Sequence, residues 1–136
     1  MKLIISPYVS VGPIKLGTSR EEIRRVLSNR PVEFQKSALS PCSTDDFREW
    51  HLHVFYRDDY RCNAVELWRG SNPVLRGHEL LSTKYIALLD EFRKLDSDLE
   101  VDVSSFISRK FGISIYSPAP FEPPASVMVA ERGYWD

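Results

Sequence analysis

The chain has little of what marks the most easily recognised protein classes. Its two cysteines, Cys42 and Cys62, form no CxxC pair of the kind that zinc ribbons and thioredoxin-like proteins use. Its glycines form no GxGxxG or P-loop pattern, which argues against the common nucleotide cradles. No apolar run approaches the roughly 20 residues of a membrane span, and the opening run is too short for a signal peptide. We therefore expect a cytoplasmic protein with no membrane partner and with reduced thiols.

The chain also lacks an excess of charge of one sign. Its 18 basic and 19 acidic residues give a formal net charge of −1. A nucleic-acid-binding domain of this size usually carries a clear basic excess, so we expect no nucleic-acid partner. Residues 37–68 differ from this balance, because they hold six acidic and three basic residues. An acidic segment predicts a partner with a basic patch, and an ordinary solvated surface is the alternative.

What the chain does contain is the make-up of one globular domain. With 136 residues, of which 43% are hydrophobic, it can bury a core without a metal or a disulfide. Two segments, residues 18–28 and 82–95, have helical spacing, and several short β-rich runs surround them. The sequence predicts a single α+β domain over residues 1–136. We expect a mostly antiparallel sheet of about six to eight short strands with two helices packed on one face.

Local patterns refine this expectation. Thr18 is the expected N-cap of the first helix, and Ile23, Val26 and Leu27 form its apolar stripe. Arg20, Arg24 and Arg25 are expected to lie off that stripe. Leu3–Ile5 is predicted as an edge strand, residues 37–47 as a loop, and the proline-rich residues 118–124 as a second loop.

The clearest predicted element is a hairpin formed by residues 50–57 and 62–68, with its turn at residues 58–61. We expect Arg57 to oppose Cys62, which separates the side chains into two faces. The expected core face carries Trp50, Leu52, Val54, Tyr56, Val65 and Leu67. The other face carries His51, His53, Phe55, Arg57, Cys62, Ala64, Glu66 and Trp68.

The second face also carries residue types that occur in metal and catalytic sites. His51 and His53 form an H-x-H pattern, which places two imidazoles on one side of a strand, and Cys62 lies on the partner strand. Cys62 would sit near the turn, away from His51, so we predict no metal and no cofactor. Cys42 has no neighbouring base or helix start to activate it, so we predict no catalytic residue and no enzyme. A small metal- or ligand-binding protein or enzyme that uses His51, His53 and Cys62 is the alternative.

The acidic and aromatic residues of the hairpin region are the better functional candidates. Aromatic side chains beside acidic ones are a common make-up of protein-binding surfaces. The predicted partner-binding residues are Asp45, Asp46, Phe55, Asp58, Asp59, Glu66 and Trp68. The alternative is that tryptophans such as Trp68 and Trp135 cover a second core.

Four segments resemble a group of small, uncharacterised bacterial proteins. Residues 11–23 resemble their "vGpi-lGmt-eeV" opening, and residues 52–56 with 64–67 resemble their "LHVfY…vEL" hairpin. Residues 111–118 and 131–134 are similar as well, so the resemblance covers most of the chain. Thr18 replaces a methionine of that opening, and Ser19 stands where many relatives have threonine. The opening alone also resembles the repeat of small outer-membrane assembly lipoproteins and of β-lactamase-inhibitor-type domains.

The resemblance implies a function by binding. Small single-domain bacterial proteins of this kind are often immunity proteins of polymorphic toxin systems, which capture a toxin and block its active site. What the resemblance implies is therefore a stoichiometric complex with another protein, a toxin domain with a basic patch. It assigns no functional residue to this chain.

Overall fold

The computed structural model of the protein describes residues 1–28, 30–40 and 42–136. Two α-helices, one 3₁₀ helix and 13 strands are present in these ranges. The helices are α1 (Arg20–Val26), the 3₁₀ helix η1 (Arg48–Trp50) and α2 (Tyr85–Leu95). The strands are β1 (Lys2–Ser6), β2 (Ser10–Val11), β3 (Ile14–Lys15), β4 (Val32–Phe34), β5 (Thr44–Phe47), β6 (Leu52–Tyr56), β7 (Cys62–Trp68), β8 (Asn72–Leu75), β9 (His78–Glu79), β10 (Glu100–Val101), β11 (Ser105–Ser108), β12 (Ile113–Tyr116) and β13 (Ser126–Ala130).

The strands form two mostly antiparallel sheets, so the predicted α+β class is confirmed. The larger sheet has the order β10-β11-β12-β13-β7-β6-β5-β4, and the smaller one has the order β3-β2-β1-β8-β9. The strand number exceeds the predicted six to eight, because several strands contain two residues and show too little alternation to be recognised. The predicted loop at residues 37–47 contains β5. The predicted edge strand β1 instead lies between β2 and β8, and its pairing with β8 is parallel.

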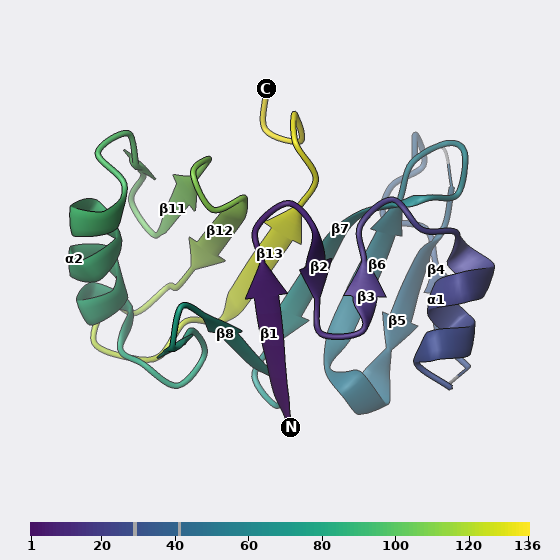
Figure 1. Ribbon diagram of the computed structural model, residues 1–136, viewed down its shortest axis with the longest axis horizontal. Coiled ribbons are helices and arrows are strands. Elements are labelled where there is room, and N and C mark those ends of the chain that lie inside the picture. Colours follow the sequence, from purple (N-terminus) through teal and green to yellow (C-terminus); the bar gives the residue numbers. More distant parts are fainter. Residues whose placement is uncertain (29, 41) are drawn as a thin grey trace.

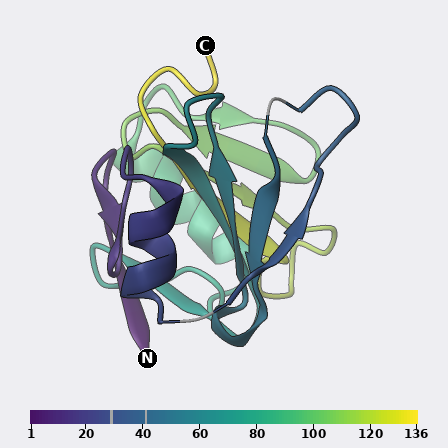
Figure 2. The same cartoon turned by 90° about the vertical axis from the view of Figure 1, so that its right-hand side faces the viewer.

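The two sheets form separate layers. Figure 1 shows the smaller sheet in front of the larger one, with α1 and α2 at opposite ends of the molecule. Turned by 90°, the larger sheet is seen beside the layer that contains α1 and β1 (Figure 2). The core fills the space between the layers, and its largest fully buried side chains include Phe47, Leu67, Leu80, Phe92 and Phe106.

The hairpin β6–β7 follows the predicted register over most of its length. Leu52 pairs with Leu67 and Phe55 with Ala64, and the core face contains the predicted Leu52, Val54, Tyr56, Val65 and Leu67. A β-bulge between Phe55 and Tyr56 then shifts the pairing, so that Cys62 opposes Tyr56 rather than Arg57. Since a one-residue shift turns a side chain to the other face, Cys62 points into the core and is fully buried.

Helix α1 begins one residue later than predicted, because Ser19 rather than Thr18 accepts the hydrogen bond from the Glu22 N–H. Its buried residues are Ile23 and, contrary to expectation, Arg20, while Val26 is exposed. Arg20 lies three residues before Ile23, which places both side chains on the same side of the helix. The apolar stripe of this helix is therefore narrower than predicted.

Helix α2 begins without a side-chain cap. Its first two N–H groups, of Tyr85 and Ile86, donate instead to the carbonyls of Glu122 and Pro120 in the proline-rich loop. The guanidinium of Arg69 donates to the next carbonyls of that loop, at Pro123 and Pro124. The loop thus caps the first turn of α2, although more than 30 residues separate the two in the sequence. None of the described helices is long and apolar enough to cross a membrane.

Candidate functional site on the outer face of the larger sheet

The face of the larger sheet that points away from the smaller sheet carries a continuous row of side chains. Register places them side by side across five neighbouring strands, and we call them the outer row: Val32, Asp46, His53, Glu66 and Met128. All five are exposed or half-buried, whereas the neighbouring inner positions Val54, Val65 and Val129 are fully buried. In the described part of the chain no helix covers this face (Figures 1 and 2). The outer row is therefore accessible to a partner.

His53 is the centre of the outer row. Its Nε2 lies 3.6 Å from Asp46 Oδ1 and its Nδ1 lies 3.6 Å from Glu66 Oε1, so one imidazole stands between two carboxylates. Asp46 Oδ2 accepts a hydrogen bond from the exposed side chain of Arg48, but Asp46 Oδ1 is buried without a hydrogen-bond partner among the described residues. A buried carboxylate oxygen without a hydrogen-bond donor costs free energy, so the Asp46 side chain is held in this position at some cost to stability.

Aromatic rings surround His53. The ring centroid of Trp68 lies 4.4 Å from that of His53, and Phe34 on the edge strand β4 lies 4.9 Å away, both in edge-on geometry. Phe34 is exposed and Trp68 is half-buried. The outer row supplies two acidic groups, and Trp68 and Phe34 beside it supply rigid aromatic rings, which give contact area at a low cost in conformational entropy.

Asp45 lies on the opposite face from Asp46, which corrects its prediction as a partner-binding residue. It is fully buried, and its carboxylate accepts two hydrogen bonds from Arg24, at 3.0 and 2.7 Å, and one from the Tyr56 hydroxyl at 2.8 Å. Burial and the neighbouring Asp45 charge raise the pKa of Tyr56 above its ordinary value. All of these contacts are internal, so no carboxylate oxygen of Asp45 faces a partner.

Arg20 completes the buried cluster. Its guanidinium lies between the rings of Tyr56 and Tyr60, 4.6 and 4.5 Å from their centroids, and donates to the carbonyl and the hydroxyl of Ser43. Tyr60 has a φ of +59°, a left-handed conformation that is uncommon for a residue with a side chain. The stacking on Arg20 and the hydrogen bond from the Arg20 N–H to the Tyr60 carbonyl hold it there. The cluster ties α1 to the turn of the hairpin.

The other predicted partner-binding residues are divided between the outer face of the sheet and the hairpin turn. Glu66 lies in the outer row with Asp46, and Trp68 lies beside the row, next to His53. Phe55 is on the same face but is buried, because the half-buried Tyr134 and Trp135 of the C-terminal segment pack over its cluster. Asp58 and Asp59 are exposed at the hairpin turn, where Asp59 accepts hydrogen bonds from Arg57 and from the Arg61 N–H. Phe34 and Met128 were not predicted. Strand pairing places Met128 in the row and Phe34 beside it, next to His53.

The alternative site of His51, His53 and Cys62 is not assembled. His51 lies in a left-handed conformation at the end of η1, outside strand β6, so the H-x-H pattern does not place two imidazoles on one face. Cys62 is on the inner face, while His53 is on the outer one. Within the described ranges, no group of three His, Cys, Asp or Glu side chains could hold a metal ion.

Both thiols are reduced and lie in environments that oppose ionisation. Burial raises the pKa of the Cys42 thiol, and its sulfur approaches the carbonyl oxygens of Tyr56 and Arg57 at 3.0 and 3.1 Å. Burial also raises the pKa of the Cys62 thiol to about 12, from an ordinary value of 9.0. A thiolate nucleophile is therefore disfavoured at neutral pH at both positions.

The raised pKa of Cys62 predicts a loss of stability in alkaline solution. A group whose pKa is higher in the folded state contributes its full stability below the unfolded value and loses it as the pH rises toward the folded value. Relative to neutral pH, we expect the Cys62 thiol to cost roughly 2 kcal/mol at about pH 10.5. Urea unfolding at both pH values measures this cost. The measurement compares Cys42→Ala with the double variant Cys42→Ala/Cys62→Ala. Between neutral pH and about pH 10.5, the double variant should lose roughly 2 kcal/mol less unfolding free energy than Cys42→Ala. Equal losses of unfolding free energy in the two proteins would contradict the burial of the Cys62 thiol.

No family model, curated protein or solved structure matches this chain in the comparisons.

Proposed function

We propose that this chain is a protein-binding module of the immunity type, which works in the cytoplasm and captures one partner protein on the outer row. The observation that carries the proposal is the position of His53 between two carboxylates on an uncovered sheet face. A binding surface needs accessible aromatic anchors and complementary charge, and Trp68, Phe34 and the pair Asp46 and Glu66 supply both.

The charge of the outer row favours a basic partner. Two of its five residues, Asp46 and Glu66, are acidic and none is an arginine or lysine, while the exposed Arg48 beside the row pairs with one oxygen of Asp46. An arginine or lysine of the partner would pair with the carboxylates of Asp46 and Glu66 and lie against the ring of Trp68. This geometry supports a toxin domain with a basic patch as the partner class, which is also what the sequence resemblance implies.

The proposal predicts that reversing one charge in the outer row weakens partner binding. Wild-type protein and the variant Glu66→Lys are immobilised and exposed to extracts of the native host, and the product of the neighbouring reading frame is tested as a purified protein. We expect one basic protein to bind wild type in a 1:1 ratio and to bind Glu66→Lys at least about tenfold more weakly. Titration calorimetry with the purified partner gives the ratio and the affinity.

The matched control is Glu21→Lys, which makes the same change on an exposed glutamate of α1, the helix that contacts the inner face of the larger sheet through Asp45. Its affinity should stay within about twofold of wild type, because Glu21 is not part of the outer row and an exposed charge is screened by salt. Equal weakening by both variants would mean that net charge, and not the outer row, governs binding. Recovery of no stoichiometric partner would refute the proposed function.

A further inference from the structure

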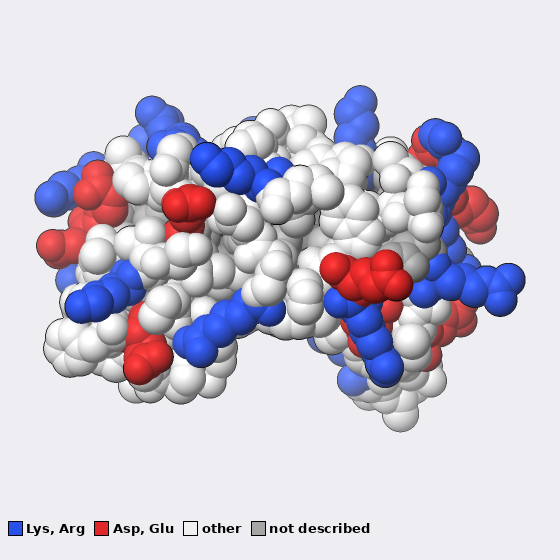
Figure 3. Space-filling view, turned by 90° about the horizontal axis from the view of Figure 1, so that it is seen from below, with Lys and Arg blue, Asp and Glu red and all other residues white. Residues whose placement is uncertain are grey.

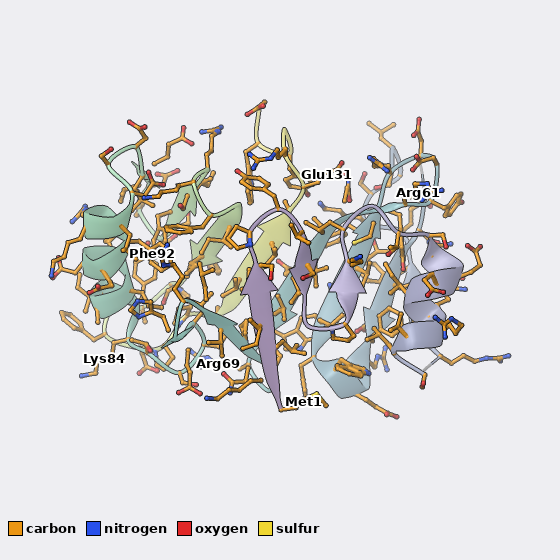
Figure 4. All side chains as sticks on the ribbon, viewed as in Figure 1. Met1, Arg61, Arg69, Lys84, Phe92 and Glu131 are labelled. Carbon is orange, nitrogen blue, oxygen red and sulfur yellow. The ribbon has the colours of Figure 1, made fainter. Side chains whose placement is uncertain are left out.

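A second feature of the molecule lies at the lower edge of Figure 1, where β1 begins. It is a cleft of about 440 Å³ between the start of β1, the end of α1, the helix η1 and the turn that joins β7 to β8. Its lining is Met1, Leu3, Leu27, Ser28, Glu49, Trp50, His51, Gly70 and Ser71. Met1 is labelled at this edge in Figure 4. A volume of this size is in the range of small-molecule sites.

Two positions in the cleft are specialised to hold one imidazole. His51 adopts φ +55° and ψ +48°, a left-handed conformation that costs a residue with a side chain free energy. Opposite it, Gly70 has a φ of +112°, and a Cβ at this position would lie 2.6 Å from Cγ of His51. The turn therefore needs glycine in order to admit the ring. Neither feature is required by the strands that flank it, since an asparagine or glycine at position 51 would close the same turn with less strain.

Two side chains that line the cleft, His51 and Trp50, have polar atoms that could bind a ligand. Among the described residues, neither the imidazole of His51 nor the indole N–H of Trp50 has a hydrogen-bond partner, whereas the hydroxyl of Ser71 donates to the Trp68 carbonyl. A neutral imidazole offers one donor and one acceptor, and an indole N–H offers a donor. Leu3 and Leu27 are buried and form an apolar floor. The cleft is thus lined by two aromatic side chains that carry hydrogen-bonding groups and by an apolar floor.

The surroundings of the cleft favour an uncharged ligand. Figure 3 views the molecule from this side, and the charged side chains are scattered over it rather than gathered into one patch. The apolar floor of Leu3 and Leu27 opposes the desolvation of an ion of either sign. Trp50 lines the cleft, and a flat molecule makes the largest contact with the face of an indole ring.

We propose that this cleft is a binding site for a small, uncharged, planar molecule, an aromatic ring that carries a carboxamide or an equivalent donor–acceptor pair. The ring lies against Trp50 and the apolar floor. The carbonyl of the ligand accepts from the indole N–H, and its N–H group donates to the free nitrogen of His51. The site uses no residue of the outer row, so it stands or fails independently of partner capture.

Benzamide is a suitable probe, because it has the proposed ring and carboxamide and no charge. The chain has three tryptophans, so a nitrogen-15 correlation spectrum contains three indole N–H signals, and that of Trp50 reports on the cleft. We expect benzamide to shift the Trp50 signal saturably, with a Kd on the order of millimolar for so small a ligand, and to leave Trp68 and Trp135 unchanged. Benzoate and cyclohexanecarboxamide, which are charged and non-planar respectively, should bind at least about fivefold more weakly.

The variant His51→Asn tests the role of the imidazole, because asparagine tolerates the left-handed conformation. It should weaken benzamide binding at least about fivefold, while His53→Asn, the matched change two residues away on the outer row, should leave it unchanged. If His51→Asn does not fold, Trp50→Phe is followed through the backbone signals of Gly70 and Ser71 and should show the same loss. No saturable shift with benzamide, equal binding of benzoate, or equal binding by the variants would overturn the proposal.

Discussion

Replacing Arg24 by methionine should lower the free energy of unfolding by about 3 kcal/mol. The substitution keeps the length of the aliphatic stem but removes both hydrogen bonds that the guanidinium donates to the fully buried Asp45. The carboxylate then retains the Tyr56 hydroxyl and the more distant Arg20, whose Nε is 3.7 Å away. A buried charge that has lost its closest counter-ion is strongly destabilising. Guanidinium chloride unfolding at neutral pH measures the loss.

The neighbouring Arg25 provides the matched control. It is exposed and pairs with Glu22 within one turn of the same helix, so Arg25→Met should leave the free energy of unfolding close to that of wild type. The double variant Arg24→Met/Asp45→Leu should recover most of the stability, because it removes both members of the buried pair. A loss for Arg24→Met as small as that for Arg25→Met would show that Asp45 is solvated, and would return it to the candidate interface.

The substitution Phe92→Ala should be still more destabilising, by about 4 kcal/mol. Phe92 is fully buried, and its ring centroid lies 5.3 Å from that of Phe106 and 5.8 Å from that of Phe111. In Figure 4 it projects from α2 toward the strands of the larger sheet. Truncation removes a large side chain that packs α2 against β11, and leaves a cavity that the surrounding close-packed side chains cannot fill.

Phe121→Ala is the control for that substitution, because it makes the same truncation on a side chain that is 73% exposed in the proline-rich loop. Its unfolding free energy should remain within about 0.5 kcal/mol of wild type. Thermal unfolding followed by far-ultraviolet circular dichroism compares the two variants. A cost for Phe92→Ala below about 2 kcal/mol would mean that α2 is loosely packed.

The elements that local pattern determines could be predicted from the sequence. Alternation alone identified the hairpin and its core face, since Leu52, Val54, Val65 and Leu67 recur with the period of two that a half-buried strand requires. The helical spacing of Tyr85, Leu88, Leu89 and Phe92 identified α2 in the same way. The parallel pairing of β1 with β8 could not be foreseen, because it joins segments about 70 residues apart through hydrogen bonds that leave no local signature.

The candidate site was predicted in part. Asp46, Glu66 and Trp68 were identified from composition, but composition does not distinguish Asp46 from Asp45, which only strand alternation places on opposite faces. The spacing of Arg20 and Arg24, one helical turn apart on α1, could have indicated a buried acidic partner. The bulge at Phe55 and Tyr56, which sends Cys62 inward, has no signal in the residue types around it.

The place of β13 in the larger sheet has a consequence for how the protein is made. It is the latest strand in the chain, yet it lies between β12 and β7 and joins them into one sheet. During synthesis, the strands β4 to β7 and β10 to β12 therefore emerge as two separate halves, each with an unpaired edge. Met128 completes the outer row from this same strand, so a nascent chain acquires the proposed capture surface only when the two halves are joined. An unfinished or truncated chain would present open strand edges to chaperones and proteases before it could hold a partner.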